Sequence, residues 1–121
     1  MSDGLILIVD DDVDIVSMME LILKGEGYRV HVAPTGKAGL EEVRREKPSL
    51  ILLDMKMPVM DGWEFIRRLR AEHTDVPPIV IVSAAEDAKA WAKEVGAAGW
   101  LPKPFDIDEL VRWAKEYARK T

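Results

Sequence analysis

Five short segments of strand character alternate along this chain with five longer segments that have a helical pattern of apolar residues. The strands are expected at 5–9, 28–33, 50–53, 79–82 and 99–101. Three of them, at 5–9, 50–53 and 79–82, are unbroken apolar runs, as is typical of a parallel sheet covered by helices on both faces. The alternation therefore predicts an α/β fold, a doubly wound parallel sheet of five strands with five helices.

Capping residues and chain breakers mark the ends of the predicted helices. The first helix is expected between three consecutive aspartates and Gly25. Thr35 and Asp61 are suitable N-caps for the second and third helices, and the second is expected to close near Lys47-Pro48. The fourth helix is expected over 85–95 and the last over 106–119.

Two of these helices have a clear inward face in the sequence. The apolar positions expected to face inward on the first helix are Ile15, Met18, Met19, Ile22 and Leu23. Those expected on the last helix are Ile107, Leu110, Val111, Ala114 and Tyr117.

Length and composition are those of one domain, expected over 1–121, with 48% apolar and 32% charged residues. The absence of cysteine excludes disulfides, thiolate metal sites and a cysteine nucleophile. A net charge of −5 argues against a protein whose main work is to hold nucleic-acid phosphates. Neither a signal peptide nor an apolar run of about eighteen residues is found, so we expect a soluble cytoplasmic protein that does not bind membranes.

Polar side chains stand where the predicted strands end. They are Asp10, Asp11 and Asp12 after the first strand, Asp54 after the third, Ser83 after the fourth and Lys103 in the loop after the fifth. Each alone is typical of an ordinary turn or helix cap. Because the carboxyl ends of parallel strands lie at one edge, where open α/β sheets bind ligands, together they indicate a site.

The residue types at this edge suit metal-assisted phosphoryl chemistry. Carboxylates that converge in one cleft repel each other unless a cation neutralises them, and Mg²⁺ prefers carboxylate and carbonyl oxygens. An ammonium and a hydroxyl group suit the oxygens of a phosphoryl group. One of the carboxylates can itself accept that group and form an aspartyl phosphate.

These residues resemble the receiver domain of two-component response regulators. The matching motifs are Ile8-Val9-Asp10-Asp11-Asp12, Leu53-Asp54-Met55-Lys56-Met57-Pro58 with Asp61-Gly62, Val82-Ser83-Ala84 and Lys103-Pro104-Phe105. The resemblance covers essentially the whole chain. It implies the flavodoxin-like or CheY-like strand order 2-1-3-4-5, and a signalling module rather than a dedicated enzyme.

The resemblance also implies the acceptor and the metal ligands. Asp54 would be the phosphoacceptor. Mg²⁺ would be bound by Asp54, by Asp11 directly, by Asp10 mainly through water, and by the backbone carbonyl of Lys56.

Three further residues take roles from the resemblance. Ser83 and Lys103 would each contact a phosphoryl oxygen, and Lys103-Pro104 would be a cis peptide. In related receivers the hydroxyl residue moves toward the phosphate, and an aromatic residue three positions before the lysine turns inward. Here that aromatic residue is Trp100. Family members more usually carry Tyr or Phe there, so a packing role for Trp100 stays open beside the switch.

The partners implied are a histidine kinase or a histidine phosphotransfer protein upstream, and a protein partner or a fused effector domain downstream. The face formed by the fourth helix, fifth strand and fifth helix would carry the output, and it could also form a dimer. No direct contact with nucleic acid is expected. The sequence is compatible with a stand-alone receiver and with the receiver of a longer protein.

Two other functions were weighed against the receiver. A phosphatase of the haloacid dehalogenase type also uses an aspartyl phosphate, but it needs a second aspartate two residues after the nucleophile, where this chain has Lys56. A receiver-like interaction domain that works without phosphorylation typically loses acidic, acceptor or lysine residues that this chain keeps. Dinucleotide binding is disfavoured because no glycine-rich turn follows the first strand.

Overall fold

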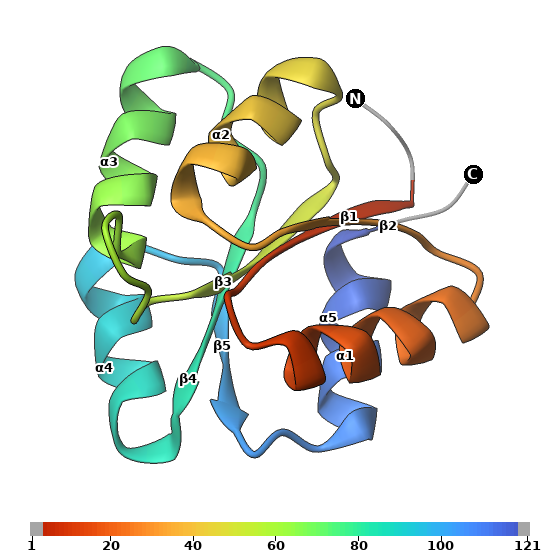
Figure 1. Cartoon of the computed structure of the whole chain (residues 1–121). Coiled ribbons are helices and arrows are strands. Elements are labelled where there is room, and N and C mark those ends of the chain that lie inside the picture. Colours follow the sequence, from red (N-terminus) through yellow and green to blue (C-terminus); the bar gives the residue numbers. More distant parts are fainter. Residues whose placement is uncertain (1–3, 119–121) are drawn as a thin grey trace.

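A computed structural model describes residues 4–118 and alternates strands with helices along the chain (Figure 1). The strands are β1 (Leu5–Val9), β2 (Arg29–Ala33), β3 (Leu50–Asp54), β4 (Ile79–Ala84) and β5 (Gly99–Lys103). The helices are α1 (Val13–Gly25), α2 (Gly36–Arg45), α3 (Gly62–Glu72), α4 (Ala85–Val95) and α5 (Ile107–Tyr117).

The five strands form one parallel sheet in the order β2-β1-β3-β4-β5, as predicted. Helices α1 and α5 cover one face, and α2, α3 and α4 cover the other (Figure 1). The strand order reverses between β1 and β3, because the chain first adds β2 on one side of β1 and then continues on the other side. Such a reversal opens a crevice at the carboxyl ends of the two strands.

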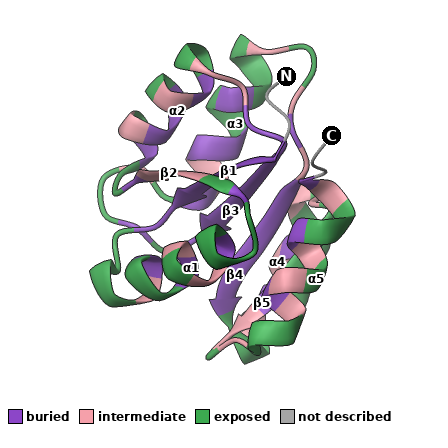
Figure 2. Ribbon diagram, turned by 90° about the vertical axis from the view of Figure 1, so that its right-hand side faces the viewer, coloured by how far each residue is buried: buried purple, intermediate pink, exposed green. Residues whose placement is uncertain are grey.

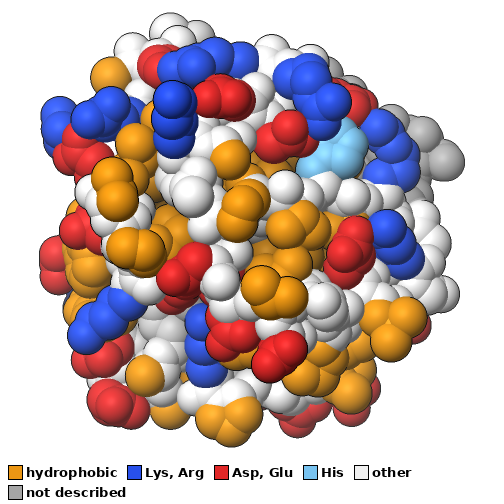
Figure 3. Space-filling model, in the orientation of Figure 1, with side chains coloured by type: hydrophobic (Ala, Val, Ile, Leu, Met, Phe, Trp, Pro, Cys, Tyr) orange, Lys and Arg blue, Asp and Glu red, His pale blue; other side chains and the backbone are white. Residues whose placement is uncertain are grey.

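Each face of the sheet has its own apolar core. Along β1, Leu7 and Val9 contact the α2–α3–α4 side, whereas Ile6 and Ile8 contact the α1–α5 side, because successive side chains of a strand point in opposite directions. Phe65 of α3 is fully buried in the first core. Figure 2 shows the result: the central strands β1, β3 and β4 are buried, whereas the edge strands β2 and β5 are partly exposed. The outer surfaces of the helices are exposed and carry charged side chains of both signs (Figure 3).

The structure corrects two positions expected on inward faces. Met18 is 47% exposed, because the buried stripe of α1 consists of Val16, Met19 and Leu23 and leaves Met18 on the flank. Ile107 is 53% exposed, because it lies in the first turn of α5, before the buried Leu110.

Several element ends also differ from expectation. Helix α2 ends at Arg45 rather than near Lys47, and α5 ends at Tyr117, so the expected end at Arg119 lies outside the described residues. The strands β3, β4 and β5 run one or two residues further than predicted, since their backbone pairing continues through polar side chains. The Lys103-Pro104 peptide is cis, as expected. None of the helices over residues 4–118 has the length and apolar character needed to cross a bilayer.

Gly39 in α2 marks a close approach between this helix and the sheet. A Cβ atom there would lie 2.8 Å from Cε1 of Phe65 and 3.0 Å from Cγ2 of Val9, both buried in the core. A Cβ atom at Gly25, the last residue of α1, would have no neighbouring atom within 4 Å. Replacing each of these two glycines by alanine therefore separates the effect of close packing from that of helix propensity.

We expect Gly39→Ala to lower the free energy of unfolding by about 1–3 kcal/mol, since overpacking outweighs the better helix propensity of alanine. Gly25→Ala is the matched control and should be neutral or stabilising by up to about 1 kcal/mol. Urea unfolding measures both. Equal stabilisation by the two substitutions would contradict close packing at Gly39.

Candidate functional site

The side chains predicted to form a site do converge at the carboxyl edge of the sheet. Asp10 directly follows β1, Asp54 is the last residue of β3, Ser83 lies near the end of β4 and Lys103 ends β5. Asp10, Asp54 and Ser83 are buried, with 2%, 7% and 3% of their surface exposed. The apolar runs before them anchor the strands in both cores, so the polar residues occupy fixed positions.

Three carboxylates form the centre of this site. Oxygens of Asp10, Asp11 and Asp54 all lie within 4.8 Å of one another. Local backbone amides orient two of them: Asp12 N–H donates to Oδ1 of Asp10 at 2.9 Å, and Lys56 N–H donates to Oδ1 of Asp54 at 3.2 Å. The side chain of Asp12 lies outside the cluster, where it caps α1 by accepting from the amides of residues 14 and 15.

Lys103 supplies the positive charge that faces this cluster. Its Nζ lies 3.2 Å from Oδ2 of Asp10 and 3.7 Å from Oδ1 of Asp54. Three carboxylates and one ammonium leave two negative charges in a largely buried space. A further cation would relieve that repulsion.

Burial is the main cause of a rise in the pKa of Asp54 from its ordinary value of 3.8 to about 6. The neighbouring Asp10 carboxylate is the second cause, and Lys103 and the Lys56 amide act in the opposite direction. In the absence of a metal ion, the fold therefore makes ionisation of Asp54 less favourable than it is in the unfolded chain.

The donor set fits Mg²⁺ and a phosphoryl group. The three carboxylates supply the hard oxygen ligands that Mg²⁺ takes. Two buried oxygens, Oδ2 of Asp10 and Oγ of Ser83, have no hydrogen-bond partner among the described residues, although the former lies near Lys103. Buried polar atoms are almost always satisfied, so Oγ of Ser83 indicates a binding position.

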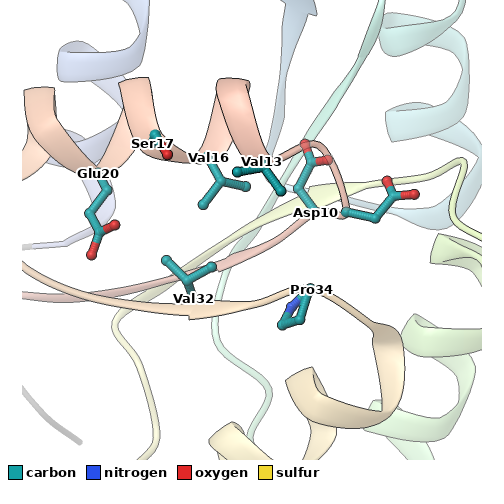
Figure 4. Close-up of a pocket in the computed structure, with 8 residues that line it drawn as sticks. Asp10, Val13, Val16, Ser17, Glu20, Val32 and Pro34 are labelled. Carbon is teal, nitrogen blue, oxygen red and sulfur yellow. The ribbon is translucent and has the colours of Figure 1, made fainter.

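Two hollows lie beside the carboxylate cluster. One, of about 300 Å³, is lined by Asp10 and Asp11 and continues between α1 and β2, where Val16 lies opposite Val32 (Figure 4). The other, of about 340 Å³, is lined by Asp54, Lys56, Ser83, Lys103 and residues of α4. Because the second contains the acceptor candidate together with the hydroxyl and the ammonium, we refer to it as the Asp54 pocket.

Trp100, the expected switch residue, lies outside the site. Its side chain is 38% exposed, and Nζ of Lys89 in α4 lies 5.7 Å from its ring. Its backbone carbonyl accepts a hydrogen bond of 3.0 Å from Nε1 of Trp113 in α5. An outward indole with a backbone anchor is compatible with a switch and with a packing role.

Three residues that line the Asp54 pocket were not predicted from the sequence. Glu86, Asp87 and Trp91 reach it from the first turns of α4. The signal available was position alone, since α4 begins directly after the strand that carries Ser83. A tryptophan at helical spacing is more often a core residue, and only the packing of α4 reveals that this one faces the pocket.

The comparisons with known proteins agree on one family. The family model described as the response regulator receiver domain matches residues 6–115. Sporulation initiation phosphotransferase F of Bacillus subtilis (strain 168) is 39% identical over 113 residues, covering 93% of this chain and 91% of that protein. The DNA-binding transcriptional regulator NtrC of Escherichia coli (strain K12) is 36% identical over 112 residues, covering 92% of this chain but 24% of that protein.

Solved structures agree with the sequence relatives. The CheY-like response regulator receiver domain protein from Methanospirillum hungatei JF-1 has a TM-score of 0.83 with 29% identity, covering 95% of this chain and 94% of that one. Chemotaxis protein CheY4 of Vibrio cholerae has a TM-score of 0.81 with 31% identity, covering 96% and 99%. The chain belongs to the response regulator receiver domain family. Receiver domains of response regulators are signalling modules rather than dedicated enzymes.

The raised pKa of Asp54 predicts how stability depends on pH. Because the folded protein binds this proton more tightly than the unfolded chain, stability falls as pH rises from about 4 to about 6. With a chelator present, we expect Asp54→Asn to raise the free energy of unfolding by about 1–3 kcal/mol at pH 7.5. The gain should shrink as pH falls below 6, and chemical denaturation at several pH values measures it.

Asp12→Asn is the matched control for this experiment. It removes a carboxylate from the same acidic loop, but Asp12 is exposed and asparagine caps helices equally well. Its effect should stay within about 0.5 kcal/mol. A loss of stability in Asp54→Asn at pH 7.5, or a gain that is independent of pH, would show that ionised Asp54 is not destabilising.

Proposed function

We propose that this protein is a phosphorylatable receiver that accepts a phosphoryl group on Asp54 from a phosphohistidine. The single observation that carries the proposal is the surroundings of Asp54: a buried carboxylate in contact range of Asp10, Asp11 and Lys103, in a pocket that also contains the unpartnered Oγ of Ser83. The apolar strand residues are sufficient to build the sheet, and its stability does not require buried charges at this edge.

Mg²⁺ is the cofactor of the proposed reaction. Asp10, Asp11 and Asp54, with the backbone carbonyl of Lys56, would hold it. When bound, it supplies positive charge that offsets the carboxylates and the phosphoryl oxygens. The fit rests on the three clustered carboxylates and on Oδ2 of Asp10, which lacks a hydrogen bond.

The protein's own residues position the transfer. An Asp54 carboxylate oxygen forms a bond to phosphorus while the bond from phosphorus to the histidine nitrogen of the donor breaks. Lys103 Nζ, already 3.7 Å from Asp54, pairs with a phosphoryl oxygen, and Ser83 Oγ donates a hydrogen bond to another. Phosphoryl transfer depends mainly on such positioning and charge stabilisation.

The partners in this proposal are those of a two-component phosphorelay. The donor is a histidine kinase or a histidine phosphotransfer protein, and the receiver occupies residues 1–121 in the cytoplasm. The output passes through the α4–β5–α5 face to a protein partner, a fused effector domain or a second copy. The relatives differ on this point: the chain spans most of the sporulation protein, but about half of transcriptional regulatory protein PrrA of Mycobacterium tuberculosis, at 50%.

The acceptor assignment is tested with a small-molecule phosphodonor and Mg²⁺. We expect intact-protein mass spectrometry to record the addition of one phosphoryl group, and Asp54→Asn to abolish it. Asp12→Asn, outside the carboxylate cluster, should still be modified. The same modification in Asp54→Asn would refute Asp54 as the acceptor, and no modification of the wild type would refute phosphorylation itself.

The proposed switch links Ser83 to Trp100. When Ser83 moves toward the phosphoryl group, it vacates space behind β4 and β5, and Trp100 turns inward from its exposed position. In the parallel pairing of β4 with β5, Trp100 lies opposite Ile81, which is two residues before Ser83. This proximity supports a link between Ser83 and Trp100.

Trp100 should become less accessible to solvent on activation. Beryllofluoride with Mg²⁺ is expected to lower the acrylamide quenching of tryptophan emission in the wild type, because the 38% exposed ring of Trp100 turns inward. In Trp100→Phe the decrease should be largely lost. A decrease of equal size in both proteins would assign Trp100 to packing.

A further inference from the structure

Trp91 of α4 packs against the core on the α2–α3–α4 side and also borders the Asp54 pocket. The pocket of about 340 Å³ is lined by Trp91 together with Asp54, Ser83 and Lys103. Its indole is half-buried, so one part packs and another part borders the open space. A large aromatic ring therefore forms one wall of the space where a phosphoryl group on Asp54 would lie.

The ring of Trp91 also contacts a cation. Nζ of Lys56, two residues after Asp54, lies 5.4 Å from the ring centroid, within the range of a cation–π contact. Among residues 4–118 no carboxylate oxygen lies within ion-pair distance of this ammonium group. Lys56 is exposed and lines the same pocket as Asp54, and the contact with Trp91 keeps its ammonium on the Trp91 side of that pocket.

A second tryptophan fixes the position of the first. Trp63 of α3 meets Trp91 edge to face, with centroids 4.9 Å apart and an interplanar angle of 71°. Nε1 of Trp63 donates a hydrogen bond of 2.9 Å to Glu94 of α4. Edge-to-face pairs are directional, and together with the hydrogen bond this one restrains α4 against α3.

We propose that Trp91 is a positioning residue that holds the Lys56 ammonium ready for a phosphoryl group on Asp54 and shields that side of the pocket from water. An exposed cation–π contact is weak compared with a charge-assisted hydrogen bond to phosphate. The ammonium can therefore leave the ring when the phosphoryl group arrives, whereas a carboxylate partner would retain it. This inference rests on the proposed function of Asp54.

The lifetime of the phosphorylated protein tests the proposal. After the phosphodonor is removed, we expect the phosphoryl group to be lost about three- to tenfold faster from Lys56→Met and Trp91→Leu than from the wild type. Trp91→Phe keeps an aromatic face and should stay within about twofold. Lys93→Met, which removes an exposed lysine of the same helix away from the pocket, is the matched control and should behave as the wild type.

A double variant separates positioning from mere structure. If Trp91 acts through Lys56, the double variant with both Lys56→Met and Trp91→Leu should lose its phosphoryl group no faster than the quicker of the two single variants. Fully multiplicative effects would show that the two residues act independently and would overturn the positioning role. A lifetime of the phosphorylated protein that is near wild-type in Trp91→Phe but shortened in Trp91→Leu supports an aromatic contact over simple space filling.

A binding measurement gives a readout that does not depend on turnover. Calorimetric titration with beryllofluoride in excess Mg²⁺ should show about three- to tenfold weaker binding to Lys56→Met and Trp91→Leu. Titration of Trp91→Leu with Mg²⁺ alone should stay within about twofold of the wild type, since this side chain does not belong to the carboxylate cluster. Unchanged beryllofluoride binding in Lys56→Met would overturn the proposal even if Trp91→Leu failed to fold.

The outcomes distinguish this inference from the function on which it rests. A wild type that is not phosphorylated on Asp54 overturns both. A wild type that is phosphorylated on Asp54, but whose variants at 56 and 91 lose the group at the wild-type rate, overturns only the role of Trp91.

Discussion

Repulsion among clustered carboxylates, two of them buried, is the interaction on which the functional part of this structure depends. Asp10, Asp11 and Asp54 lie within 4.8 Å of one another, and Lys103 balances only part of their charge. Burial and the neighbouring Asp10 carboxylate both raise the pKa of Asp54, so holding this cluster in its ionised form costs stability. The surrounding fold must therefore be stable enough to hold it, and the cluster favours any ligand that brings positive charge.

The two apolar cores supply that stability and also the precision of the site. Because β1 and β3 are buried on both faces, a shift of one residue in either strand would move every side chain to the wrong face. The register that pairs Val9 with Leu53 therefore also brings Asp10 beside Asp54. The strand order reverses at this pair, so no crossing helix covers the carboxylates and they remain open to a ligand.

Most of the fold and the composition of the site could be predicted from the sequence. Continuous apolar runs identify buried parallel strands, and polar residues at the strand ends identify the candidate edge. The errors fell at positions where periodicity alone cannot decide. Met18 lies beside the buried stripe of α1, and Ile107 precedes that of α5. The role of Trp91 depends on how α4 packs against α3 and on the path of the loop after Asp54, and neither is written in local spacing.

The sequence by itself determined that the strands are parallel and that the central ones are buried. It also determined that the chain has the aspartates, the hydroxyl residue and the lysine of the receiver motifs, at the ends of the first, third, fourth and fifth strands. These properties depend on residue type and local order, which are readable one segment at a time. Only the tertiary structure decided the distances: Lys103 reaches both Asp10 and Asp54, Ser83 Oγ is buried without a partner, and Trp91 faces the pocket while Trp100 points outward. Distances between elements depend on how the helices pack on both faces of the sheet, and that packing is a property of the whole chain.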